Sequence, residues 1–299
     1  MQVDPYYSRN LVSSLDNVDA NVEQLTSELS SGVRVTSLST DPVAAGENVS
    51  LLNQIQQDDS FTSTSSEVSS QLQVADSALG NVVSELTSAI SLATSANNGT
   101  LNSSDLKSIS NQLAGIRDEV TSLANTNYQG QYIFSGGQTS TAPFTTSNAT
   151  SPATTTYNGD EDIKTLQTPN GQSIQLNLPG DQIFSAGAGN GVFGALNSLI
   201  ADFSGGVASG TAVADTQALS TAMGFVSQQR VAIDNSLSRM TAATEAVSGE
   251  KTQLTVAQTS LMQADVAQVA TQLSLSKAQQ TALEAVISQL GSDDLFSKL

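Results

Sequence analysis

The stretch LTVAQTSLMQADVAQVATQLSLSKAQQTALEAVISQL, residues 254–290, decides the fold. From Met262 onward, its core positions recur in steps of four and three residues without interruption. This is the heptad spacing of a helix that buries one stripe of side chains against another helix. The stripe comprises Met262, Val266, Val269, Leu273, Ser276, Gln280, Leu283, Ile287 and Leu290.

The first thirty residues carry a matching stripe with the same alternation of steps. We therefore expect both chain ends to form long amphipathic helices that pair, and we predict that the apolar members of both stripes form an assembly interface. Ser276 and Gln280 are polar at core positions, where such residues either set the register and the partner at a cost in stability or mark loose packing. The N-terminal stripe comprises Leu11, Leu15, Val18, Val22, Leu25 and Leu29.

The C-terminal stripe continues upstream, and the pattern predicts one helix from about Ala214 to Gly291. An extra step of four residues near Gln258 breaks the alternation, and such a stutter locally unwinds a coiled coil. We interpret it as a boundary: the upstream stripe packs on the second and third helices, and the C-terminal stripe packs on the first. The upstream stripe comprises Leu219, Val226, Ile233, Leu237, Met240, Val247 and Leu254.

Helix boundary signals divide the N-terminal half. The first helix runs from about Pro5 to Ser30 and ends at Gly32, and Asp41-Pro42 begins a second helix with an N-cap and a proline at the first helical position. The second helix carries a buried stripe from Val68 to Ala93 and stops at 97–99. We expect Ser104 to cap a third helix that ends near Asn127.

The character of the chain changes at Tyr128, where Gly, Thr, Asn and Pro replace the helical spacing. Asn170-Gly171 separates the runs 163–168 and 172–178, which predicts a β-hairpin. A short helix follows from about Val192 to Phe203. We expect residues 139–190 to form a surface insertion with few core contacts.

The expected fold class is therefore mainly α: long antiparallel helices from both chain ends form coiled-coil or bundle domains, with a small β-rich insertion in the middle. The predicted division has three parts. These are a terminal coiled-coil assembly domain (1–40 plus 258–299), a helical bundle domain (41–130 plus 212–257) and an inserted outer domain (131–211).

Composition excludes several function classes. The net charge is −18 and the ten basic residues are scattered, so we expect neither nucleic acid nor a membrane as partner. The chain contains no Cys and no His, which removes disulfides, thiolate metal sites and His-based catalysis. We expect no enzyme, no catalytic residue, no cofactor and no metal site. The first thirty residues lack the apolar region of a signal peptide, so we expect any export to use another route.

Three segments resemble a known family. LSSGVRV at 29–35, followed by DPVAA at 41–45, is similar to the "LSSGxRI…DDxAA" segment of flagellins and their relatives. YIFSGG at 132–137, with Pro143-Phe144, is similar to the "GxYxFxG…PF" segment of the hook–filament junction branch of that family. Residues 265–290 resemble the family's C-terminal helix.

The resemblance implies a secreted structural subunit of the bacterial flagellum, located outside the cell at the junction between hook and filament. It implies export through the flagellum's own type III apparatus, with a chaperone on the C-terminal helix. The implied partners are further copies of the chain in a ring-like layer, the other junction protein and flagellin. Two alternatives remain: filament flagellin itself, and a secreted coiled-coil adhesin or effector.

Overall fold

The computed structural model describes residues 5–147, 152–185 and 191–296, with side chains described from Arg9 to Gln289 within these ranges. The chain packs as two compact units. The terminal unit comprises Met1–Gln57 and Gly249–Leu299, and the central unit comprises Asp58–Ser248. The three-part division proposed from the sequence stays a prediction.

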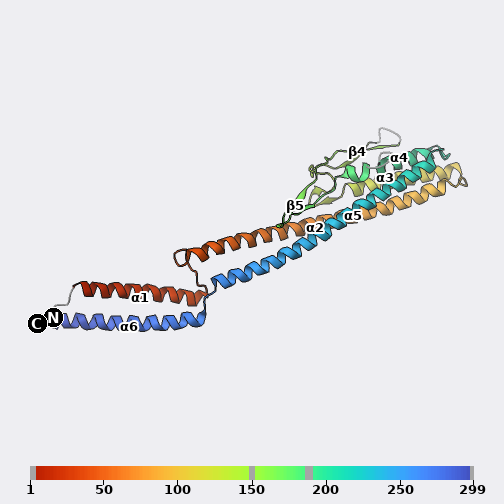
Figure 1. Ribbon diagram of the computed structural model, residues 1–299. Helices are drawn as coiled ribbons and strands as arrows, with labels where there is room; N and C mark the ends of the chain where they lie inside the picture. Colours follow the sequence, from red (N-terminus) through yellow and green to blue (C-terminus); the bar gives the residue numbers. More distant parts are fainter. Residues whose placement is uncertain (1–4, 148–151, 186–190, 297–299) are drawn as a thin grey trace. The chain divides into compact units, whose positions relative to one another are not determined.

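Long helices dominate, and three short antiparallel strand pairs lie in the middle of the chain (Figure 1). This arrangement confirms the expected fold class. Among the described residues, no helix combines the length and apolar character needed to cross a membrane. The elements in chain order are α1 (Pro5–Ser31), α2 (Pro42–Ala96), α3 (Ser103–Ala124), β1 (Asn127–Tyr128), β2 (Gln131–Tyr132), β3 (Phe144–Ser147), β4 (Thr154–Tyr157), β5 (Thr165–Gln167), β6 (Ser173–Gln175), the π-helix η1 (Asp181–Ser185), α4 (Gly191–Ser204), α5 (Ala212–Met262) and α6 (Val266–Phe296).

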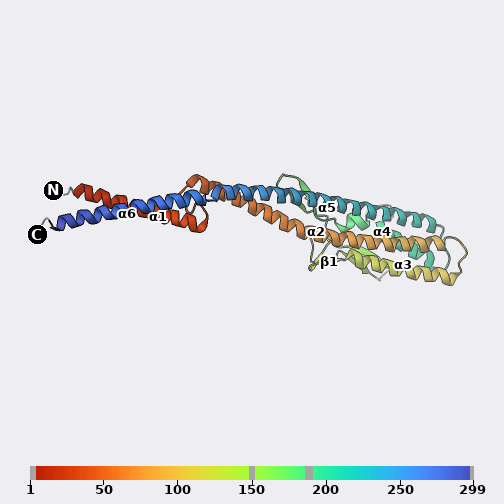
Figure 2. The ribbon, with the colours of Figure 1, turned by 90° about the horizontal axis from the view of Figure 1, so that it is seen from below.

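The helical core of the central unit follows the predicted stripes. In this unit α2 lies between α5 and α3 (Figure 2), and the stripe of α2 is buried from Val68 to Ala93. On α5, the predicted positions from Leu219 to Val247 are buried, apart from Leu237, which is partly buried against the same core. Arg230 of α5 forms an ion pair with Asp76 of α2, with Nε and Oδ1 2.8 Å apart.

The predicted cap of α3 is wrong by two residues. Asn102, not Ser104, is the N-cap, and its side chain accepts hydrogen bonds from the backbone N–H groups of Ser104 and Asp105. The Asp105 side chain accepts in return from the backbone N–H of Asn102, which completes a capping box. Asn102 is the cap because Asp105 follows it by three residues, the position at which a capping box requires an acidic or amide side chain to accept the reciprocal hydrogen bond.

The expectation that residues 139–190 carry few core contacts is also wrong. Phe144 lies at the centre of an aromatic cluster, with ring centroids 5.2 Å from Phe184 and 5.1 Å from both Phe193 and Tyr157. Phe144, Phe184 and Ile174 belong to the same buried core as α2, α3, α4 and α5. The β-rich segment is therefore part of the central unit's core. The predicted hairpin is confirmed, since β5 and β6 pair antiparallel with Leu166 opposite Ile174.

A steric constraint explains why glycine occupies both positions at the end of the YIFSGG segment. Gly136 has φ +71°, and a Cβ there would collide with the Asp160 carboxylate. The backbone N–H of Gly137 donates to Asp160 Oδ1 at 2.5 Å. Asp160 also accepts from the N–H of Asp162 at 3.2 Å. The carboxylate at 160 thus holds the turn after Phe134, and only glycine admits its approach.

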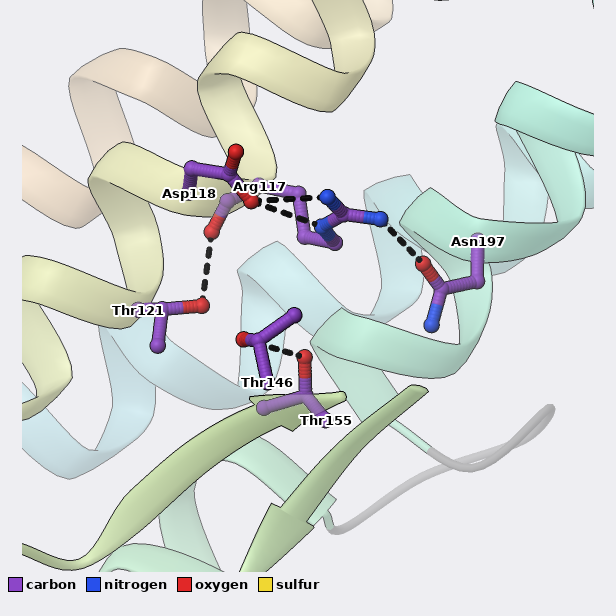
Figure 3. A network of polar contacts seen from close by, with 6 residues as sticks. All are labelled: Arg117, Asp118, Thr121, Thr146, Thr155 and Asn197. Atoms are coloured by element: carbon purple, nitrogen blue, oxygen red, sulfur yellow. Dashed lines mark hydrogen bonds and ion pairs between the residues drawn. The ribbon is translucent and has the colours of Figure 1, made fainter. Parts of the chain in front are cut away.

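A buried arginine joins α3 to α4 (Figure 3). The side chain of Arg117 is only 7% exposed. It donates from Nε and Nη2 to Asp118 Oδ1 at 3.0 and 2.7 Å, and from Nη1 to Asn197 Oδ1 of α4 at 3.4 Å. The β3–β4 pair lies nearby in the same view, with the hydroxyls of Thr146 and Thr155 3.3 Å apart. Pairing matters here because a buried charge without a partner is strongly destabilising.

Asp215, in the first turn of α5, predicts a pH effect on stability. Burial, followed by the neighbouring Asp202 carboxyl group, raises the pKa of Asp215 above its ordinary value. A raised pKa means that the folded state binds this proton more tightly than the unfolded state. The contribution of Asp215 to folding stability is therefore favourable at acid pH and is lost as pH rises. Asp215→Asn should therefore raise Tm at pH 7, and the gain should disappear below the usual titration range of aspartate.

Asp202→Asn is the matched control, because it removes the other member of the same carboxyl pair. We expect a smaller gain at pH 7, because burial of Asp215, the larger cause, remains, and we expect the double variant to gain no more than Asp215→Asn alone, as measured by thermal unfolding across pH. Additive gains, or a gain that persists in acid, would contradict the coupling of the two carboxyl groups.

Candidate assembly interface

Helices α1 and α6 lie side by side and run antiparallel in the terminal unit (Figures 1 and 2). Their polar contacts fix the register. Asn21 Nδ2 donates to Ser276 Oγ at 3.2 Å, and Gln280 Nε2 donates to Asp19 Oδ1 at 2.8 Å. Ser276 is buried. Both polar core positions therefore have partners on α1, which supports the interpretation that they set register.

The apolar contact between these helices is narrow. Leu25 of α1 packs with Val269 and Leu273 of α6, and all three side chains are buried. Ala264 closes one end of this cluster, and Val22 packs against it. The core of the terminal unit is therefore small, since a buried core residue in a globular domain typically touches six to twelve others.

The structure places most of the predicted interface residues in or beside this contact. Most of their side chains are buried or half-buried within one chain, so their role between subunits stays a prediction. Leu290 lies outside the described side chains. Leu25, Val269 and Leu273 are buried, and Leu11, Leu15, Val18, Val22, Leu29, Met262, Leu283 and Ile287 are half-buried.

The side chain of Val266 is 54% exposed in the single chain, and its predicted place in an assembly interface also stays a prediction. The expected single helix from Ala214 to Gly291 is wrong: α5 ends at Met262 and α6 begins at Val266. Asp265 caps the new helix, and its Oδ1 accepts from the backbone N–H groups of Ala267 and Gln268 at 3.0 and 3.1 Å. Helix α5 thus ends four residues after Gln258, where the extra step of four lies, and Val266 lies outside the buried stripe.

The segment after α1 crosses this break and pairs with it. The backbone N–H of Ala264 donates to the carbonyl of Gly32 at 2.9 Å, and that of Arg34 donates to the carbonyl of Met262 at 2.7 Å. Val33 and Gln263 form an antiparallel bridge. Gly32 has φ +68°, the left-handed conformation that commonly ends a helix. We call residues 32–41 together with 261–265 the junction.

Arg34 satisfies two carbonyls at the end of α5. Besides its backbone bond to Met262, its Nη2 donates to the carbonyl of Leu261 at 3.3 Å. The last carbonyls of a helix have no partner inside the helix, and a cation is favourable beside them. Nη1 of the same guanidinium lies 3.0 Å from Asp41 Oδ2.

Asp41 caps α2, as predicted. Its Oδ1 accepts from the backbone N–H of Ala44 at 3.0 Å. This backbone bond, followed by the bond from Arg34, holds the pKa of Asp41 below its ordinary value. One guanidinium therefore connects the end of α5 to the start of α2. The sequence identified Arg34 and Asp41 only as family motif residues and did not predict this role. The available signal was an arginine and an aspartate placed between a helix stop and a helix start.

Exposed apolar side chains concentrate in the terminal unit. Nine of the thirteen large hydrophobic side chains that are exposed among the described residues belong to it, although it is the shorter unit. The terminal unit thus exposes more large apolar side chains per residue than the central unit. The nine are Val12, Leu38, Val43, Val49, Leu52, Val256, Val266, Leu275 and Val286.

Comparison with known proteins places this architecture. Residues 6–139 match the family described as the bacterial flagellin N-terminal helical region. Flagellar hook-associated protein 3 of Salmonella typhimurium is 33% identical over 187 residues, and that of Escherichia coli is 30% identical over the same length. Each alignment covers 62% of this chain and 57% of the relative, so the chain spans little more than half the length of either.

A solved structure shares the fold. The structure of a putative flagellar hook-associated protein from Vibrio parahaemolyticus superposes with a TM-score of 0.65 at 23% identity. The superposition covers 74% of this chain and 99% of that one.

Asp265→Ala should loosen α6 without disturbing the central unit. Loss of an N-cap side chain costs about 1 kcal/mol, which corresponds to roughly fivefold faster amide exchange in the first turns of the helix. Asp265→Ser is the control, because serine retains a capping oxygen and should leave exchange near the original rate. Equal acceleration in both variants, or acceleration spread into α2 and α3 of the central unit, would contradict the capping role.

Proposed function

We propose that this chain, of which residues 6–139 match the bacterial flagellin N-terminal helical region, is a structural subunit of the flagellum that forms the junction between hook and filament. The observation that carries the proposal is the 33% identity over 187 residues to a flagellar hook-associated protein 3. The relatives are named flagellar hook-associated protein 3, and the proposal assigns no catalytic role to this chain.

The terminal unit supports an assembly role. Its α1–α6 pair has a small core, and the unit as a whole carries nine of the thirteen exposed large hydrophobic side chains among the described residues, a combination that favours burial against neighbouring chains. We propose that copies of the chain form a ring-like layer, in contact with the other junction protein on one side and with flagellin on the other. An export chaperone on α6 and passage through the flagellum's own type III apparatus complete the proposal, and both rest on the family resemblance.

Immunogold labelling of isolated flagella tests the location. A single narrow band where hook meets filament is the expected result. Label along the whole filament would instead identify a filament flagellin, and absence of label from flagella would overturn the flagellar role and favour a secreted adhesin or effector.

The α1–α6 contact gives a mutational test. Leu283→Asp or Ile287→Asp places a carboxylate at a half-buried position of α6, so either variant should abolish incorporation into flagella or binding of the chaperone. The central unit should stay folded, because neither residue belongs to its core. Thr281→Asp is the matched control: Thr281 is exposed on the same helix, so the added charge should be tolerated.

Incorporation is measured by immunoblot of sheared flagella, and folding is measured by circular dichroism of the purified variants. Normal incorporation of Leu283→Asp would contradict the importance of this stripe. Equal failure of Thr281→Asp would mean that added charge anywhere on α6 is harmful, which would also remove the argument from burial.

A further inference from the structure

Four Asn-Gly pairs occur in the chain, at 98–99, 158–159, 170–171 and 190–191. In such a pair the backbone nitrogen of glycine can attack the side-chain carbonyl carbon of the preceding asparagine, because glycine carries no Cβ that would obstruct the approach. Asparagine is accordingly among the thermolabile residues. Asn190 lies outside the described residues, so the structure distinguishes the other three pairs.

No contact holds the reacting groups of Asn98 and Gly99 in the connection between α2 and α3. Both residues are exposed, and they follow the end of α2 at Ala96. Gly99 has φ +69°, and apart from the adjacent residues no heavy atom lies within 4 Å of the place that a Cβ would occupy there. Within the described ranges, neither the Asn98 side chain nor the Gly99 N–H has a hydrogen-bond partner. The amide of the neighbouring Asn97 is held, since its Nδ2 donates to Thr216 Oγ1 at 3.1 Å.

The turn at 170–171 holds the same chemical groups by a hydrogen bond. The N–H of Gly171 donates to the carbonyl of Thr168 at 2.8 Å, which closes the turn between β5 and β6. The glycine nitrogen must release its proton before it forms a new bond, so a hydrogen bond from this N–H opposes the reaction. Asn170 is exposed, as Asn98 is, so any protection comes from the bond and not from burial.

The pair at 158–159 is held by a side-chain bond and by crowding. Asn158 Nδ2 donates to Thr145 Oγ1 at 2.9 Å. A Cβ at Gly159 would collide with the side chain of Tyr157 and the carbonyl of Ser135, so the backbone there has little room to rotate toward the asparagine side chain. Of the three described pairs, only 98–99 has both reacting groups free.

We propose that Asn98 is a site of spontaneous covalent modification, and that it reacts faster in the folded protein than Asn158 or Asn170. The nitrogen of Gly99 gives its proton to water and forms a bond to Cγ of Asn98. The bond between Cγ and Nδ2 then breaks, and Nδ2 leaves as ammonia with a proton taken from water. The product is a cyclic succinimide.

Water opens the succinimide at either of its carbonyl carbons. One opening gives aspartate, and the other gives isoaspartate, in which the main chain runs through Cγ. Overall, one water is consumed and one ammonia is released, with no oxidant, reductant or enzyme. The reaction takes place within one chain, so it does not depend on the proposed function.

The modification changes the charge at one defined place. Either product adds a carboxylate just after Ala96, at the C-terminal end of α2, where the helix dipole disfavours negative charge. Nothing in the reaction reverses it under aqueous conditions, so the modified fraction rises with the age of the protein.

Peptide mapping of the purified full chain tests this proposal. One set of samples is incubated at neutral pH under native conditions, and a parallel set is incubated in concentrated urea. Mass spectrometry follows the conversion of each Asn-Gly peptide with time, and electron-transfer fragmentation distinguishes isoaspartate from aspartate. The unfolded set is the control, because all the pairs are then equally free.

We expect Asn98 in the folded protein to convert at least roughly fivefold faster than Asn170, which is the effect of a typical net hydrogen bond on an equilibrium. Asn158 should also lag behind Asn98, and in urea the rates should become similar. Conversion of Asn158 or Asn170 as fast as that of Asn98 would overturn the proposal. Absence of conversion at Asn98, or the same difference in rates in urea, would overturn it as well.

A variant of the hairpin turn isolates the role of the hydrogen bond. Pro169→Gly loosens the turn, because proline fixes the backbone angle that the second turn position requires. The Gly171 N–H should then exchange faster, and the conversion of Asn170 should rise toward that of Asn98, whose own rate stays unchanged. Faster exchange at Gly171 without faster conversion of Asn170 would overturn the protective role of this bond, and with it the predicted order of the sites.

Discussion

The terminal unit depends on how the end of α5 is satisfied. A helix that stops at Met262 leaves carbonyl groups without partners, and a chain that restarts at Val266 leaves N–H groups in the same condition. Arg34 supplies donors to the carbonyls of Leu261 and Met262, Asp265 accepts from the new helix, and Gly32 accepts from Ala264 between them. Without these hydrogen bonds, a break between α5 and α6 at this point would be unfavourable, and α1 would have no antiparallel partner. The short segment LSSGVRV therefore stabilises the break at which α5 ends and α6 begins.

The sequence predicted those features that local periodicity encodes. The stripes on α2, α5 and α6, the stop at Gly32, the Asp41 cap and the hairpin at Asn170-Gly171 all depend on residues within a few turns of one another. The break at 263–265 escaped prediction because Ala264 and Asp265 are compatible with a helix interior, and only pairing with residues more than two hundred positions away makes the break favourable. The core role of Phe144 and Phe184 escaped for the same reason: aromatic contacts between a strand, a π-helix and α4 leave no periodic signal.

The candidate interface shows the same division. The heptad positions of α1 and α6 were visible as a stripe, but spacing alone does not state whether a stripe is filled by the same chain or by a neighbour. Burial of Leu25 and Leu273, together with the bonds of Ser276 and Gln280, assigns much of the stripe to the contact within the chain. Leu275 and Val286 of α6 lie outside this buried contact and are exposed.

The bond between Asn21 and Ser276 joins residues 255 positions apart. Closing so long a loop from an unstructured chain is entropically costly, and contacts of such high sequence separation form late in folding. The central unit lies entirely inside this loop, so its folding shortens the effective distance that the ends must cover. The topology predicts an order of folding: the middle of the chain, whose contacts close shorter loops, folds first, and the two ends pair last. The same topology makes the terminal unit the final part to form and the first to open, which is compatible with the assembly role proposed for it.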